Sequence, residues 1–193
     1  ARDTRSPLYV KAALAAATEA AFQIEPVLSE QSGNVDPTRF AFVVLSDVTS
    51  VPAQFQEALA KYVRSGGSLL VAAGPAAARQ RKIPVLDEPV SEGRYFSRAG
   101  ERFSVVGEAD PAHPSLKKSG RWEGVKFYYA VKVQPGPQAK VIVRLSDQTP
   151  ILVEKKIGEG RVLLFASTLD NISNDFPLLP LFVPFIEQTA RYL

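Results

Sequence analysis

Apolar and polar positions along the first half of the chain predict an alternation of helices and strands. Residues 7–21 have small and apolar side chains at helical spacing. Residues 39–47 and 68–74 are nearly continuous apolar runs, which is typical of strands buried on both faces of a parallel sheet. Between them, residues 51–67 have an apolar helical stripe and end in two glycines, the residue type that favours a helix C-cap. This order predicts a right-handed βαβ unit.

A weaker strand signal lies ahead of this unit. Residues 22–28 alternate as a strand does, with Phe22, Ile24 and Val27 predicted to face inward. A doubly wound sheet usually begins with a strand before its first helix, and residues 1–6 are too few and too polar to provide it. We therefore expect the sequence to be part of a longer protein.

The second half of the chain has a β pattern that ends in one helix. Periodicity is weak over about 76–125, which predicts an irregular insertion that could include a helical turn. Short alternating or apolar runs predict strands at residues 102–107, 125–133, 139–146, 150–157 and 161–168. The last two runs are joined by Gly158-Glu159-Gly160, which predicts a hairpin. Residues 177–193 are entered through prolines and have the apolar stripe of a helix.

Composition narrows the class of protein. The 193 residues, 46% hydrophobic and 22% charged, are ordinary for a single globular domain, which we assign to residues 1–193. The net charge of +3 comes from scattered residues with no nucleic-acid motif, so we expect no nucleic-acid partner. No apolar run reaches the roughly 18 residues of a membrane span, so this domain itself is not expected to insert into a membrane. The absence of cysteine excludes disulfides and thiolate chemistry.

Three stretches are expected to meet where the strands of the parallel sheet end, because ligands of open α/β sheets bind there. They are Asp47, the turn at Ala73-Gly74-Pro75, and the polar stretch 168–175. Carboxylate and amide oxygens at this edge could bind a small polar ligand, or they could only cap the next helix and form turns. The candidate ligand-binding residues are Asp47, Ala73, Gly74, Pro75, Asp170, Asn171 and Asn174.

No residue pattern assigns a catalytic group, a metal site or a cofactor. His113 is the only histidine, and as a general base it would need a serine or threonine partner, since there is no cysteine. Set between prolines, it is also typical of a fixed loop residue. Trp122 and the aromatic run 127–129 could form a recognition face or fill the core beneath the insertion.

Three motifs together resemble a known domain. They are FVVLSDV at residues 42–48, ALAKYVRSGGSLLVAAGP at 58–75, and the ending TPILVEKKIGEGRVLLFASTLDN at 149–171 with its helix. They resemble the class I glutamine amidotransferase-like domain, in the version found in bacterial membrane-anchored proteins related to the aerotolerance (Bat) group. The resemblance implies an α/β, flavodoxin-like three-layer sandwich whose parallel sheet is extended by an antiparallel β meander.

The resemblance also implies an amidotransferase activity, but the residues at the expected catalytic positions of this chain differ from those of the family. Class I amidotransferases use a cysteine on a strand-to-helix turn and a His-x-Glu pair, whereas this chain has Ala73-Gly74 at the turn and Ser115 two residues after His113. We therefore expect a non-catalytic module for ligand sensing or protein interaction within a larger membrane-associated protein. The alternative is a hydrolase-like enzyme that uses the strand-end carboxylates.

The same resemblance implies a setting. The expected partners are other domains of the parent protein or a membrane complex, with a small polar ligand as a further possibility. The expected location is a soluble domain of an inner-membrane-anchored bacterial protein, with the periplasmic side slightly favoured.

Overall fold

The computed structural model describes residues 6–17, 22–83, 85–86, 89–95 and 102–193, which fold around a seven-stranded sheet. Its strands are β1 (Val43–Ser46), β2 (Ser68–Ala72), β4 (Ser104–Ala109), β5 (Lys126–Phe127), β7 (Ala139–Leu145), β8 (Pro150–Ile157) and β9 (Gly160–Phe165). They lie in the order β1-β2-β9-β8-β7-β4-β5. β1, β2 and β9 are parallel, and the remaining pairs are antiparallel. The predicted parallel sheet with an antiparallel extension is confirmed.

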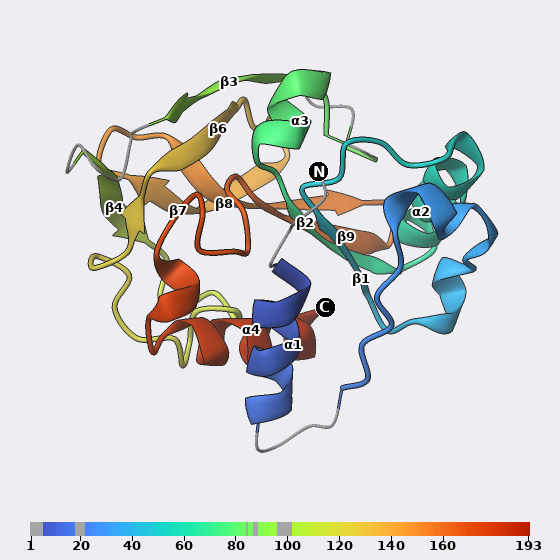
Figure 1. Cartoon of the computed structure of the whole chain (residues 1–193), viewed down its shortest axis with the longest axis horizontal. Helices are drawn as coiled ribbons and strands as arrows, with labels where there is room; N and C mark the ends of the chain where they lie inside the picture. Colours follow the sequence, from blue (N-terminus) through green and yellow to red (C-terminus); the bar gives the residue numbers. More distant parts are fainter. Residues whose placement is uncertain (1–5, 18–21, 84, 87–88, 96–101) are drawn as a thin grey trace.

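Helices cover both faces of this sheet. They are α1 (Ser6–Ala16), α2 (Ala53–Arg64), α3 (Pro75–Gln80) and α4 (Phe182–Tyr192), with 3-10 turns at Ser29–Asn34, Pro37–Arg39 and Phe176–Leu178. α1 and α4 pack against each other, and Figure 1 shows them on one side of the sheet with α3 on the other. Right-handed connections from β1 to β2 and from β2 onward place α2 on the side of α3. The result is the three-layer sandwich expected from the sequence.

The region predicted as an irregular insertion contains regular structure. α3 lies at its start, and β3 (Val90–Tyr95) pairs with β6 (Tyr129–Val133) in a separate antiparallel sheet beside α3. The single strand predicted at 125–133 is in fact two strands, β5 and β6, in different sheets. The pairing partner changes here: the N–H groups of Tyr128 and Tyr129 both donate to the carbonyl oxygen of Ser173, at 2.8 and 2.9 Å, whereas β5 pairs with β4 and β6 pairs with β3.

The helix and hairpin that precede and follow the parallel strands form as predicted. α2 buries Phe55, Leu59 and Val63 and is followed by Gly66, whose φ of +108° is in the region that favours glycine. β8 and β9 form a hairpin with Ile157 paired to Gly160. These elements hold β9 next to β2 and so complete the parallel part of the sheet.

Residues 22–28 are not a strand in this structure. No backbone hydrogen bond joins residues 22–27 to any other described residue. Phe22 and Ile24 are partly buried against the core, as predicted, whereas Val27 is 41% exposed and the inward orientation predicted for it is wrong. The strand-like pattern is therefore present without a partner strand.

Trp122 is part of the core and not of a recognition face. It is 2% exposed, and its ring centroid lies 4.5 Å from that of Phe176 and 5.1 Å from that of Phe185. Its Nε1–H donates to Oγ of Ser119 at 2.9 Å, so the one polar atom of the indole has a partner. This cluster fixes the position of α4 against the loops that precede β5.

Candidate functional site

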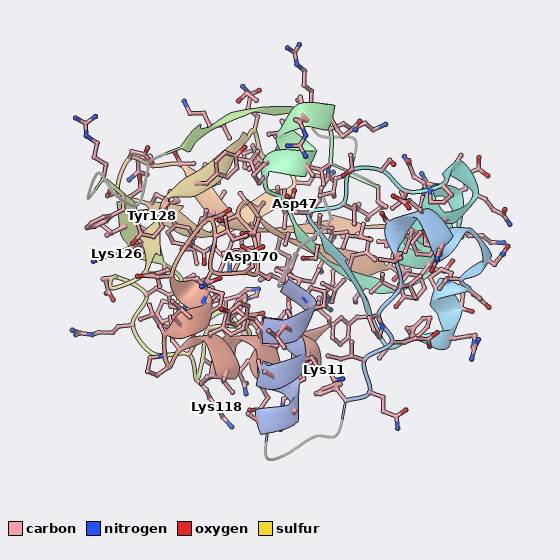
Figure 2. The ribbon with its side chains drawn as sticks, viewed as in Figure 1. Lys11, Asp47, Lys118, Lys126, Tyr128 and Asp170 are labelled. Carbon is pink, nitrogen blue, oxygen red and sulfur yellow. The ribbon has the colours of Figure 1, made fainter. Side chains whose placement is uncertain are left out.

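The carboxyl ends of β1, β2 and β9 meet at one edge of the sheet because these three strands are adjacent and parallel. Asp47 follows β1, the turn at Ala73–Pro75 follows β2, and Thr168 lies shortly after β9. A Cβ atom on Gly74 would lie 2.9 Å from Cγ of Asp47 and would collide with Cγ2 of Thr168. The three predicted stretches therefore come together, and Figure 2 shows Asp47 close below α3 with Asp170 beyond it.

The Asp47 carboxylate caps α3. Its Oδ1 accepts the N–H groups of Gly74 at 2.7 Å, Ala76 at 3.1 Å and Ala77 at 3.2 Å. The first N–H groups of a helix have no partner within the helix, and Pro75 has none to offer. The capping position itself is Gly74, which has no side chain, so a carboxylate 27 residues earlier in the chain takes that role.

The backbone conformation of Asp47 allows its carboxylate to reach the start of α3 while its N–H stays bonded to β2. Its φ is +44°, a left-handed conformation that aspartate tolerates better than most residues. The N–H of Asp47 still donates to the carbonyl of Ala72 at 2.8 Å, so β1 stays paired with β2 up to this residue. The side chain is 8% exposed, and a buried carboxylate at a helix N-terminus is held both by hydrogen bonds and by the helix dipole.

The strand–turn–helix of a nucleophile turn is present, but it has neither a reactive atom nor free donors. Ala73 is fully buried, and the collision of a Cβ with Thr168 leaves no room for a side chain at position 74. The N–H groups that could stabilise a negatively charged oxygen of a substrate already bind Asp47. The turn is thus closed by the chain's own carboxylate.

Asp170 is held by its neighbours in a local turn. Its Oδ1 accepts the hydroxyl of Thr168 at 2.7 Å and the N–H of Ile172 at 3.0 Å, and the residue is 2% exposed. Hydrogen bonds to the second residue onward are typical of aspartate turns. The capping and turn role that the sequence left open is therefore the role that the structure gives to Asp170.

Asn174 is likewise internal, whereas Asn171 lies nearer the surface. The amide nitrogen of Asn174 donates to Oγ of Ser167 at 2.9 Å and to the carbonyl of Thr168 at 2.8 Å. Its Oδ1 accepts the N–H of Phe176 at 3.1 Å. Asn174 therefore fastens the loop that leads from β9 to α4, and its amide does not face a ligand site.

A second polar cluster, which the sequence did not predict, surrounds His113. The ring of His113 lies edge-on to that of Tyr192, with centroids 5.0 Å apart, and its Nε2 is 3.6 Å from Oε2 of Glu154. The Tyr192 hydroxyl donates to Oε1 of Glu154 at 2.5 Å, and the Arg161 guanidinium lies 4.3 Å above the Tyr192 ring. Four separate segments supply these side chains, so no motif spacing could have indicated them.

The His113 cluster is held by internal contacts. Nδ1 of His113 accepts the backbone N–H of Ser115 at 3.3 Å, so neither ring nitrogen faces a serine hydroxyl among the described residues. The contacts with His113, and then with Tyr192 and Arg161, hold the pKa of Glu154 below its usual value despite burial. Burial and the bond to Glu154 raise the pKa of Tyr192.

Neither cluster gathers the ligands of a metal ion. Within the described ranges no three His, Asp or Glu side chains converge as a metal site. A surface hollow exists at the other end of the sheet, where Phe127, Lys132 and Asp147 contribute to its lining. It does not include any of the candidate ligand-binding residues.

Solved structures with the same fold are found over almost the whole chain. A cytoplasmic protein of Salmonella typhimurium, STM3548, matches with a TM-score of 0.76 and 15% identity over 96% of this chain and 85% of its own. A ThuA-like protein from Parabacteroides merdae matches with a TM-score of 0.63 and 16% identity over 97% of this chain and 83% of its own. The chain has a class I glutamine amidotransferase-like fold. No family model and no curated protein matches the sequence.

The same fold also occurs as a part of larger chains. A cold-adapted β-galactosidase from Rahnella sp. R3 matches with a TM-score of 0.60 and 15% identity over 83% of this chain but only 24% of the enzyme. At such identities the likeness concerns the fold alone. None of these solved structures bears on the Bat group, so that resemblance stays a prediction.

The predicted location is contradicted. We expected a soluble domain of an inner-membrane-anchored protein, but two neighbours that match nearly end to end, STM3548 and STM1381 of Salmonella typhimurium, are both titled cytoplasmic proteins. STM1381 has a TM-score of 0.71 and 13% identity over 98% of this chain and 87% of its own. A separate observation is that no helix in the described part of the chain is long and apolar enough to cross a membrane.

Proposed function

We propose that this chain is a non-catalytic amidotransferase-like module that acts by binding another protein. The observation that carries the proposal is the capping of α3 by Asp47, which takes up the N–H groups of Gly74, Ala76 and Ala77. Acyl transfer on this fold needs a nucleophile at the turn and free donors beside it for the developing oxyanion. Here the turn offers neither.

Binding of a small polar ligand at the same edge receives little support. Asp47, Asp170 and Asn174 are all more than nine-tenths buried, and each already accepts or donates at least two internal hydrogen bonds. A ligand would have to replace these bonds and open the turn. The net cost of leaving a buried donor or acceptor without a partner is about 1–3 kcal/mol for each group.

The hydrolase-like alternative is weakened by the same contacts. A general acid or base must reach the substrate with an accessible, titratable oxygen. Oδ1 of Asp47 and Oδ1 of Asp170 are both engaged by backbone N–H groups, and these contacts hold the two carboxylates as structural acceptors. Surface contact with another polypeptide does not require that either carboxylate be released.

Enzyme assays combined with NMR test the proposal. Ammonia release from glutamine and hydrolysis of nitrophenyl esters and glycosides are measured for the purified chain and for Asp170→Asn. Amide shifts of Gly74, Ala76 and Ala77 are followed during titration with glutamine and simple sugars. We expect no turnover above the blank and no saturable shift. Turnover that falls at least about tenfold in Asp170→Asn, or saturable shifts at these amides, would overturn the proposal.

A further inference from the structure

The outer edge of β1 is a short parallel-strand edge of four residues that has no charge, proline or bulge. β1 reads Val-Val-Leu-Ser, and among the described residues it pairs only with β2. Exposed edges in native sheets are normally short, charged, bulged or covered. An uncharged apolar run of this kind is instead typical of strands paired on both sides.

The hydrogen-bond register shows which groups face outward. The N–H of Asp47 donates to Ala72 of β2, and alternate residues of a strand direct their backbone groups to opposite sides. Leu45 therefore faces β2, while Val44 and Ser46 direct their N–H and C=O groups away from the sheet. No backbone hydrogen bond between the described residues uses these outward groups.

The position of α1 indicates which strand would lie next to β1 at this edge. Strand order runs from β1 to β2 to β9, with α3 on one face and α1 beside α4 on the opposite face (Figure 1), and right-handed crossovers place α2 on the face of α3. Because crossovers are right-handed, a helix on that opposite face connects strands that progress the other way, outward from β1. The flavodoxin-like order puts the strand that precedes such a helix next to β1, and the strand that follows it one place further out.

Residues 22–28, which follow α1, fit the outermost place. They have the alternation of a strand and partly bury Phe22 and Ile24, but residues 22–27 make no backbone hydrogen bond with the described residues. The rings of Phe22 and Phe42 meet edge to face at 6.3 Å, which keeps this segment beside the start of β1. A parallel strand placed between this segment and β1 would have a neighbour without a described backbone partner on each side.

We propose that the outer edge of β1 binds one further β-strand, apolar and parallel to β1, delivered by polypeptide joined to the amino end of α1. Residues 1–5 read Ala-Arg-Asp-Thr-Arg and do not have the composition of this strand. Its residues face α1 and α4 on one side of the sheet and α2 on the other, which requires Val, Ile or Leu at successive positions. The proposal does not depend on whether the module is catalytic.

The test extends the full chain at its amino end. One fusion carries a six-residue Val/Ile-rich strand joined to residue 1, and the matched control has Asp at alternate positions of that strand. Hydrogen exchange at single amides is compared between the two. We expect the Val44 and Ser46 amides to exchange at least about 100-fold more slowly in the strand fusion, while Leu45 and Asp47, already bonded to β2, change little. The thermal midpoint should rise by at least about 4 °C.

Two further measurements keep the outcome decisive. Val44→Pro removes an outward N–H without touching the β2 ladder, so it should cancel the gain of the fusion; because Val44 packs against the core, the unextended Val44→Pro chain is the reference for that gain. Equal exchange in fusion and control overturns the proposal. Protection of Val44 and Ser46 produced by the same strand as a free peptide but not by the fusion also overturns it, since the strand would then come from another molecule. Dimerisation of the unextended chain with both amides protected would assign the edge to a second copy.

Discussion

Replacement of Asp47 by alanine is the most direct test of the capped turn. The substitution removes the acceptor of three buried N–H groups, those of Gly74, Ala76 and Ala77. A buried donor without a partner costs about 1–3 kcal/mol, and the three costs are not additive because one carboxylate serves all of them. Alanine in the left-handed conformation at φ +44° adds about 1–2 kcal/mol. We expect a total loss of about 4 kcal/mol in the free energy of unfolding.

Two matched variants divide this loss into its causes. Asp47→Gly removes the carboxylate but relieves the backbone strain, so its loss should be smaller than that of Asp47→Ala by about 1 kcal/mol. Asp47→Asn keeps an oxygen acceptor and tolerates the left-handed conformation, so it should lose only about 1–2 kcal/mol. The expected order of stability is Asp, then Asn, then Gly, then Ala.

Urea unfolding followed by fluorescence of the single tryptophan, Trp122, measures these differences, since the ring is 2% exposed in the folded chain. With a slope of about 2 kcal/mol per molar urea, the Ala variant should unfold at a urea concentration lower by about 2 M. An Asp47→Ala midpoint within about 0.3 M of the wild type would refute the capping role. Glycine less stable than alanine would refute the account of backbone strain.

Three other predictions concern the same strand ends and the His113 cluster. Gly74→Ala should lower the free energy of unfolding in urea by about 1–3 kcal/mol because the added Cβ meets Cγ2 of Thr168. Thr168→Ser in the same chain removes that methyl group and should restore part of the loss. If nothing is restored, this contact is not the cause. Asn174→Ala should lower the free energy of unfolding by about 2–4 kcal/mol in the same assay, because the side chain makes three internal hydrogen bonds. Asn171→Ala, nearer the surface, should change it by less than about 0.5 kcal/mol. Equal effects would contradict the internal role of Asn174. The lowered pKa of Glu154 means that its contribution is complete above its unfolded pKa of about 4.5 and is lost as the pH falls through the lower folded value. Glu154→Gln should therefore flatten stability against pH below about 4.5 in thermal unfolding, and an unchanged slope would contradict the cluster's contribution.

The parallel half of the fold could be predicted because its signals are local. Continuous apolar runs predict β1 and β2, and the stripe containing Phe55, Leu59 and Val63 predicts α2. The convergence of the strand ends follows from parallel pairing alone. Once the strand order is assumed, the sequence therefore predicts which residues meet there.

The role of the residues at that edge could not be read from the sequence. Asp47 caps a helix that begins 28 positions later, and only its left-handed backbone turns the carboxylate toward those donors. The sequence alone does not distinguish a helix-capping aspartate from a ligand-binding one. The division of 125–133 has a similar origin, because the carbonyl of Ser173, distant in sequence, bonds Tyr128 and Tyr129. The His113 cluster joins four segments and has no pattern of its own.

The carboxyl edge of the sheet and the outer edge of β1 differ in whether the backbone N–H and C=O groups there have hydrogen-bond partners. We therefore assign a structural role to the first edge and a binding role to the second. At the carboxyl edge, Asp47 accepts the N–H groups of Gly74, Ala76 and Ala77 at the start of α3, so a ligand could bind these groups only by breaking those bonds. Along the outer side of β1, Val44 and Ser46 direct donors and acceptors outward, and an added strand gains bonds without breaking any between described residues. Substitution at Asp47 should therefore change stability without changing strand binding, whereas Val44→Pro should abolish strand binding beyond any effect that it has on the stability of the unextended chain. A pair of variants that failed to separate these two effects would mean that the β1 edge and the α3 cap form one coupled unit.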